Sequence, residues 1–174
     1  MSYEIIAKTD VIRLEKLHAD HASKFLFAVK RSEQLHKGYV DLPNTKEKFL
    51  EYVKFKDNER NVSLVVIDND SSEFSGVINI NEIIKGCFNS AFLGYYAFEP
   101  FSRKGFMSCA MGLVMDYSRK ELGLHRLEAN IQPDNQASIR FIEKMGFVKE
   151  GFSKKYLKIG KEYKDHERFA ALLF

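Results

Sequence analysis

Residues 92–108 read FLGYYAFEPFSRKGFMS, and this stretch decides the fold. Its first half, from Phe92 to Phe98, has the composition of a strand, and a helix is expected from about Ser108, after a short basic loop. Backbone N–H groups at the start of a helix converge on one point, which suits a phosphate, and Gly105 lets a ligand approach closely. A basic turn before a helix is also ordinary solvated surface, so this fragment alone leaves both interpretations open. It is not a P-loop, because the closing Gly-Lys-Ser/Thr is missing.

A second informative stretch, residues 132–147, reads QPDNQASIRFIEKMGF. The pattern predicts the end of a strand and then a short helix from Asn135 to Met145, which Gly146 terminates. Asn135 and Ser138 lie one helical turn apart. They fit a helix cap with its first-turn partner, and they also fit two polar groups that face a ligand.

Outward from these stretches, the pattern alternates between strands and helices without a repeat or a linker. Three strands joined by hairpin-like turns precede the basic loop, and strands alternate with helices after it. The second helix begins with a capping box of Asn44 and Glu47. The predicted strands lie at 11–14, 62–67, 74–84, 92–98 and 126–131 and near 156 and 169; the predicted helices start near 20 and 44 and cover 108–122 and 135–145.

Length and composition indicate one domain, expected to span residues 1–174. The chain is 45% hydrophobic, which is enough for one core. Cys87 and Cys109 lack metal-ligand spacing, and His18 and His21 lack a third ligand, so no metal site is expected. A net charge of +3 is too small to indicate nucleic-acid binding, and no segment has the apolar length of an export signal or a membrane span. We therefore expect a cytoplasmic protein that binds neither nucleic acid nor membrane.

Basic residues are in excess near the C-terminus. Between Ser153 and Arg168 there are six lysines and arginines against three acidic residues. This excess could favour an acidic partner or cofactor phosphates, although a solvated hairpin is the simpler interpretation.

The two polar stretches, in this order, are typical of the GNAT acetyltransferases, and the chain resembles that superfamily over nearly its whole length. Residues 102–107, SRKGFM, resemble the superfamily loop Gln/Arg-x-x-Gly-x-Gly/Ala, with Gly105 in place and departures at Ser102 and Met107. Within the superfamily, the chain closely resembles the ribosomal-protein-alanine N-terminal acetyltransferases. The resemblance is carried by a run from Val77 through Lys85-Gly86, Leu93-Gly94-Tyr95 and Lys104-Gly105 to His125-Arg126, and by the tail with Glu150-Gly151, Tyr156-Leu157 and Asp165-His166.

The resemblance implies an α/β (α+β) GNAT fold with a mixed, mostly antiparallel seven-stranded sheet and about four helices. The sheet would splay between its fourth and fifth strands, 92–98 and 126–131. Acetyl-CoA would be the cosubstrate, with pantetheine lying along the open strand edge as an additional strand. Ala97 and Phe98 would hold pantetheine, while Asn135 and Ser138 would face pantetheine and the thioester. The residues expected to bind the pyrophosphate are Arg103, Lys104, Gly105, Phe106, Met107 and Ser108.

Acetyl transfer to an amine needs a hydrogen-bond donor for the oxyanion, removal of a proton from the amine and a proton for the leaving thiolate. A backbone N–H of the strand that ends at Phe98 is the expected oxyanion donor. Many GNAT enzymes protonate the thiolate with a tyrosine, but that position here is Ile142. We expect Ser138 to replace it as a hydrogen-bond donor or a water relay, because an unassisted hydroxyl is a poor formal acid. No base stands out; the candidates are Glu82, Glu128, Asp165 and His166.

The weak signal for a base favours one class of acceptor. An N-terminal α-amine has a pKa of about 8, whereas a lysine side chain has one near 10.4, so only the α-amine is appreciably neutral at pH 7. We therefore expect a protein N-terminus as the acceptor. A small amine, such as a polyamine or an antibiotic, and a non-catalytic CoA-binding module remain as alternatives, and the chain is expected to be a monomer or a homodimer.

Overall fold

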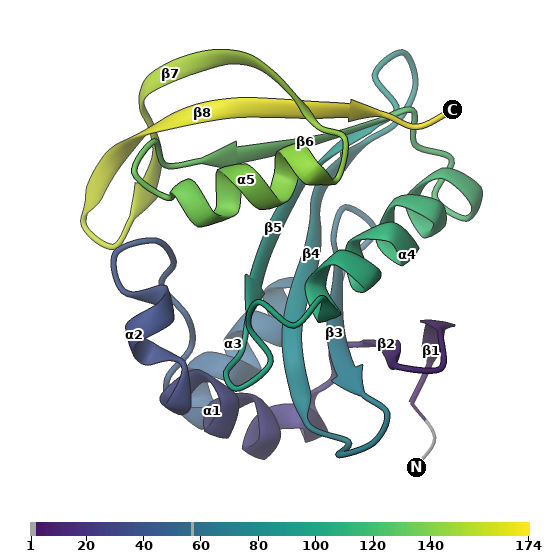
Figure 1. Cartoon of the computed structure of the whole chain (residues 1–174), viewed down its shortest axis with the longest axis vertical. Coiled ribbons are helices and arrows are strands. Elements are labelled where there is room, and N and C mark those ends of the chain that lie inside the picture. Colours follow the sequence, from purple (N-terminus) through teal and green to yellow (C-terminus); the bar gives the residue numbers. More distant parts are fainter. Residues whose placement is uncertain (1–2, 57) are drawn as a thin grey trace.

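The computed structural model describes residues 3–56 and 58–174, and its strands form one eight-stranded sheet (Figure 1). The order across the sheet is β1-β2-β3-β4-β5-β6-β8-β7. Among these strands, β5 and β6 pair in parallel and every other neighbouring pair is antiparallel. The expected mixed, mostly antiparallel α/β architecture is therefore confirmed. The strands are β1 (Ile5–Lys8), β2 (Ile12–Lys16), β3 (Val62–Asp68), β4 (Phe74–Ile84), β5 (Ser90–Ala97), β6 (Arg126–Ile131), β7 (Val148–Ile159) and β8 (Glu162–Leu172).

The hydrophobic pattern did not predict two short elements, one strand and one helix. The described helices are η1 (Ala19–His21), α1 (Ala22–Arg31), α2 (Glu33–His36), α3 (Lys46–Lys56), α4 (Phe106–Lys120) and α5 (Gln136–Lys144). The strand β1 and the helix α2 have four residues each, which is too short for a periodic pattern to be recognised. The start of α3 also differs from the prediction. Thr45, not Asn44, caps it, since the Thr45 hydroxyl accepts the N–H of Lys48 at 3.3 Å.

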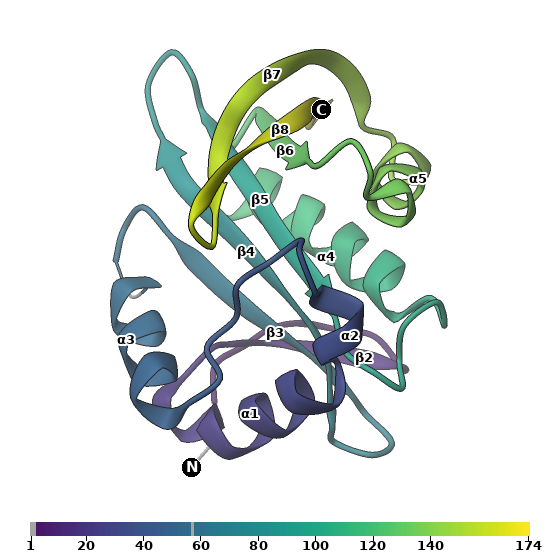
Figure 2. The same ribbon diagram turned by 90° about the vertical axis from the view of Figure 1, so that its left-hand side faces the viewer.

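Helices cover both faces of the sheet, and each face has its own core (Figures 1 and 2). The helices α4 and α5 pack on one face, where Met111 and Ile142 are fully buried. The helices α1 and α3 pack on the other, through Phe25 and Phe49. Alternate residues of β3 serve the two cores, with Leu64 and Val66 on one side and Val65 and Ile67 on the other. This alternation follows from the period of two along a strand, and it explains why β3 is an almost continuous run of apolar residues.

The sheet opens between β5 and β6. Their parallel pairing runs from Ser90 opposite Arg126 to Leu93 opposite Ala129. Beyond that point β5 continues to Ala97 and β6 to Ile131 without further pairing, and Figure 1 shows the two strands separating. The predicted splay is therefore present at the predicted pair of strands, and it leaves an unpaired backbone edge on β5.

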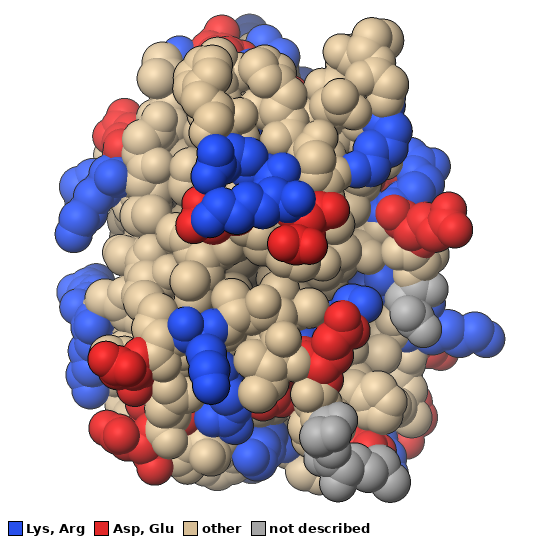
Figure 3. Space-filling model, turned by 90° about the vertical axis from the view of Figure 1, so that its right-hand side faces the viewer, with Lys and Arg blue, Asp and Glu red and all other residues tan. Residues whose placement is uncertain are grey.

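Charged side chains of both signs are interspersed on the face that carries α4 and the β1 edge (Figure 3). On α4, for example, Asp116 pairs with Lys120 at 3.2 Å. No helix in the described part of the chain has the length and hydropathy needed to cross a lipid bilayer. Residues 3–56 and 58–174 also contain no group of three or more His, Cys, Asp or Glu side chains placed to hold a metal ion.

Candidate active site

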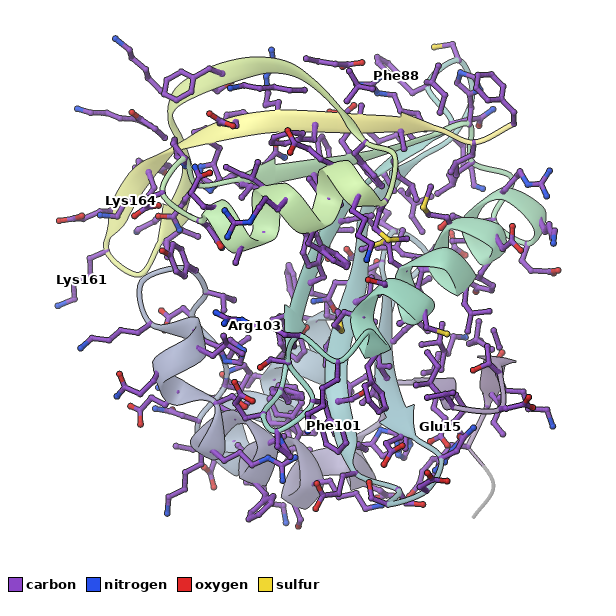
Figure 4. The ribbon with its side chains drawn as sticks, viewed as in Figure 1. Glu15, Phe88, Phe101, Arg103, Lys161 and Lys164 are labelled. Carbon is purple, nitrogen blue, oxygen red and sulfur yellow. The ribbon has the colours of Figure 1, made fainter. Side chains whose placement is uncertain are left out.

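The loop before α4 presents backbone N–H groups to solvent. Arg103 and Gly105 both have left-handed backbone angles, with φ of 60° and 88°, and Gly105 occupies the N-cap position of α4 without a side-chain cap. The first N–H groups of a helix have no partner within the helix, and its N-terminus carries a partial positive charge. Arg103, Lys104 and Gly105 are exposed, and Figure 4 shows Arg103 on this loop beside the end of β5. This arrangement suits a phosphate group.

The two departures from the superfamily loop both have structural partners. The hydroxyl of Ser102 donates to Glu99 Oε1 at 2.6 Å, inside the loop. The sulfur of Met107 lies so close to Gly76 on β4 that a Cβ added there would be 2.3 Å from it. Gly76 therefore makes room for a larger side chain than the small residue expected at position 107. Phe101 anchors the loop against Phe106, with ring centroids 5.1 Å apart.

At the end of β5, the backbone of Ala97 faces the opening and that of Phe98 does not. The N–H of Phe98 donates to the carbonyl of Ser75 next to β4 at 2.9 Å, and its side chain is fully buried. Because backbone groups alternate in direction along a strand, the N–H and C=O of Ala97 point to the other side, away from β4. The N–H of Phe98 is thus already bonded within the sheet, whereas that of Ala97 faces the opening; contact of these residues with pantetheine stays a prediction.

Across the opening from β5, Ser138 lies in the first turn of α5, the helix that follows β6. Asn135 caps this helix, because its side-chain oxygen accepts the N–H of Ser138 at 3.2 Å. The hydroxyl of Ser138 lies 2.8 Å from the hydroxyl of Tyr95 on β5. Ile142 is fully buried in the core, so the position of the usual tyrosine offers no polar group. The Ser138 hydroxyl is thus held between α5 and β5, where a proton donor for the leaving thiolate is expected.

Tyr95 is a site residue that the motif analysis missed. Its ring packs against Phe141 of α5, with centroids 5.2 Å apart. Burial raises the pKa of the Tyr95 phenol well above its ordinary value, although the hydrogen bond with Ser138 partly opposes this effect. Alternation along β5 could have placed Tyr95 on the α5 face, but it could not have identified Ser138 as its partner.

The carboxylates predicted as bases all have other partners. Glu82 pairs with Arg60 and lines a surface hollow near Phe55. It lies four residues along β4 from Ile78, the partner of Tyr95, or about 13 Å at roughly 3.3 Å per residue. Glu82 is therefore not beside Ser138, and its action as a base stays a prediction.

Glu128 and the two β8 candidates are also occupied. Glu128 pairs with Arg126 at 2.9 Å. Asp165 accepts the backbone N–H of Lys155 at 2.7 Å and so holds an irregular stretch of the β7–β8 hairpin. Nδ1 of the buried His166 lies 2.9 Å from the carbonyl of Lys164. Figure 4 shows Lys161 at the tip of this hairpin, pointing away from the sheet.

Residues in and just after α2 contact the ends of both β5 and β6, the two strands that flank the opening. The sequence did not predict these contacts. Nε2 of the buried His36 lies 2.7 Å from the carbonyl of Ala97 at the end of β5. Gln132, just after β6, donates its side-chain N–H to the carbonyl of Gly38 at 3.1 Å. Since a carbonyl only accepts, His36 carries its proton on Nε2, and its Nδ1 has no hydrogen-bond partner in the described part of the chain. Burial lowers the pKa of His36, opposed by its bond to Ala97.

Acidification is expected to destabilise the fold partly through His36. Its pKa is lowered in the folded state, so below about pH 6.5 the unfolded chain binds a proton that the folded chain does not. The free energy of unfolding should therefore fall as the pH falls through 6.5. A His36→Gln variant keeps an N–H for the carbonyl of Ala97 and does not titrate. Its Tm should therefore decrease less than that of the wild type when the pH is lowered from 7.5 to 5.5. Parallel Tm curves for the two proteins would show that His36 is not a source of this dependence. Burial also lowers the pKa of His21, so this residue should contribute a slope of the same sign to both proteins.

Comparison with known proteins identifies the family. Residues 12–148 match the family described as acetyltransferase (GNAT) domain. The chain is 33% identical over 134 residues to the probable N-acetyltransferase YjcK of Bacillus subtilis, covering 77% of this chain and 74% of that protein. It is 34% identical over 101 residues to the [Ribosomal protein uS5]-alanine N-acetyltransferase of Escherichia coli, covering 58% of this chain but only about half, 52%, of that protein.

Solved structures share the fold at lower identity. An acetyltransferase from Salmonella typhimurium that modifies the N-terminal serine of ribosomal protein L7/L12 has a TM-score of 0.88 at 20% identity, covering 98% of this chain and 100% of that one. RimJ of Mycobacterium smegmatis, in complex with CoA-disulfide, has a TM-score of 0.84 at 20% identity, covering 92% and 81%. A spermidine N-acetyltransferase mutant from Vibrio cholerae has a TM-score of 0.76 at 20% identity, covering 95% of each chain.

Proposed function

The chain belongs to the GNAT acetyltransferase family, and on this premise we propose that it transfers acetyl from acetyl-CoA to the N-terminal α-amine of a protein. The observation that carries this proposal is that the opening between β5 and β6 holds the hydroxyl of Ser138, which can donate a hydrogen bond, while the carboxylates predicted as bases have other partners. Such a site can protonate a leaving thiolate, yet it offers little help in deprotonating an acceptor. It suits an amine that is already partly neutral.

Different residues along and beside β5 would bind the cofactor, stabilise the oxyanion and protonate the thiolate. Pantetheine would lie on the edge of β5 beyond Leu93, as an additional strand, with its pyrophosphate at Gly105 and the start of α4. When the amine nitrogen attacks the thioester carbon, the negative charge develops on the carbonyl oxygen, and the N–H of Ala97 is the backbone donor on this side of the strand. As the C–S bond breaks, sulfur takes the hydrogen of Ser138. The surplus proton of the amine passes to water, from which Ser138 is reprotonated.

The acceptor follows from proton chemistry. A lysine side chain or a polyamine must lose a proton held with a pKa near 10.4, whereas an N-terminal α-amine has a pKa of about 8. A difference of more than two pKa units corresponds to roughly 3 kcal/mol, which a strong base or a desolvated pocket would have to supply. Similarity to the E. coli ribosomal-protein-alanine acetyltransferase supports the same acceptor class. The fold shared with a spermidine acetyltransferase keeps a small amine as the alternative.

A panel of acceptors tests this proposal. We expect kcat/KM with acetyl-CoA to be at least about tenfold higher for short peptides that begin with Ala or Ser than for spermidine or for an N-terminally blocked peptide with one internal lysine, because of the pKa difference. Peptide sequences that differ only in the first residue provide the matched control. A preference for spermidine would replace this proposal with the small-amine alternative, and binding of CoA without turnover of any amine would favour a non-catalytic module.

A further inference from the structure

Two hydroxyl groups meet across the opening, and one has no role in the mechanism above. Tyr95 Oη on β5 and Ser138 Oγ on α5 are 2.8 Å apart, although 43 residues separate them in the chain. The tyrosine also lies 3.5 Å from the backbone carbonyl of Ser138, which is too long for a strong hydrogen bond. Its main polar partner is thus the side chain proposed to protonate the thiolate.

The surroundings keep Tyr95 neutral and in one orientation. Its ring packs on Phe141 and against the core beneath α4 and α5. Burial disfavours the phenolate, so the tyrosine keeps its proton at physiological pH and can act as a donor. It is therefore a persistent hydrogen-bond donor.

The direction of this hydrogen bond decides what Ser138 can do. If Ser138 donated to Tyr95, its single hydrogen would be occupied and the thiolate would lack a donor. If Tyr95 donates, the oxygen of Ser138 is held in place and its hydrogen is left for another acceptor. Only the second arrangement is compatible with Ser138 as the acid.

We propose that Tyr95 is a positioning residue that donates its hydroxyl hydrogen to Ser138 Oγ and thereby directs the hydrogen of Ser138 to the sulfur of CoA. This inference rests on the proposed function, because it assigns Tyr95 a task in that acetyl transfer. Tyr95 keeps its proton throughout: the C–S bond breaks, sulfur takes the Ser138 hydrogen, and water returns a proton from the amine to Ser138. Loss of the phenolic hydroxyl should therefore slow the departure of the thiolate without weakening the binding of acetyl-CoA.

A double-mutant cycle on Tyr95 and Ser138 tests this inference. Tyr95→Phe should lower kcat about tenfold, the value of one well-made hydrogen bond, with the Kd for acetyl-CoA and the Tm nearly unchanged. In a Ser138→Ala background the same replacement should have almost no further effect on kcat, because the hydroxyl it positions is already gone. Tyr117→Phe, on the far part of α4, is the matched control and should behave as the wild type.

Three results would overturn the inference. Tyr95→Phe could lower kcat by the same factor in both backgrounds, which would show that it acts independently of Ser138. It could raise the Kd or lower the Tm enough to account for the loss, which would make its role structural. Finally, it could leave kcat unchanged. If the α-amine proposal fails, the cycle is measured with the amine that the acceptor panel identifies, because departure of the thiolate is common to every acceptor.

Discussion

Replacing Ser138 with alanine is expected to lower kcat by about 10²-fold, a typical contribution of one general acid. The Kd for acetyl-CoA should change much less, because the hydroxyl would act on the leaving sulfur rather than on the bound cofactor. Steady-state kinetics with an N-terminal Ala or Ser peptide, together with calorimetric binding of acetyl-CoA, separates the two effects. The position at which the superfamily resemblance would place a tyrosine is the buried Ile142, which offers no polar group.

Ser138→Thr provides the control, since it restores a hydroxyl at the same position and should recover part of the activity. Unchanged turnover with weaker cofactor binding in Ser138→Ala would contradict the prediction. The hydroxyl would then be a pantetheine contact, and the thiolate would leave without an acid from α5.

Replacing Gly105 with glutamate is expected to abolish the stabilisation that acetyl-CoA gives to the fold. In the wild type, cofactor at 100 times its Kd should add about 2.7 kcal/mol to the free energy of unfolding. The added carboxylate would stand where the start of α4 presents its N–H groups, and it would repel the pyrophosphate. Thermal melts with and without acetyl-CoA measure this difference.

Gly86→Glu is a matched control for backbone strain. Gly86 has a φ of 80°, close to the 88° of Gly105, and at both positions an added Cβ would meet nothing within 4 Å. Without cofactor, the Tm of both variants should therefore be lower than that of the wild type by a similar amount, since a side chain in the left-handed region costs roughly 1–2 kcal/mol. Gly86 lies in the turn between β4 and β5, so that variant should keep the full shift with acetyl-CoA. An equally large shift in Gly105→Glu would remove this loop from the cofactor site.

The hydrophobic pattern predicted the elements that are long and regular. The opening between β5 and β6 was implied by the resemblance to the GNAT superfamily, and the pattern of β3 reflects burial on both faces. The short elements β1 and α2 escaped prediction because four residues contain about one helical turn or two strand periods. The missed α2 mattered, because it carries His36 to the carbonyl of Ala97.

The candidate site was predictable only where a local motif marks it. Gly105 and Asn135 could be assigned because their roles depend on the start of a helix, which is visible in a few residues. The hydrogen bond between Tyr95 and Ser138 depends on how α5 packs on the sheet, which no local pattern encodes. The same limit explains Glu82: its ion pair with Arg60 and its distance along β4 become visible only in the folded chain.

One measurement tests the central claim most directly: the site of acetylation on a peptide that carries both a free N-terminal Ala or Ser and one internal lysine. After incubation with the protein and acetyl-CoA, fragment-ion mass spectrometry locates the added acetyl group. We predict modification of the α-amine, with a rate that rises with pH through the α-amine pKa of about 8. Modification confined to the lysine, or activity with spermidine-like amines alone, would contradict the N-terminal assignment.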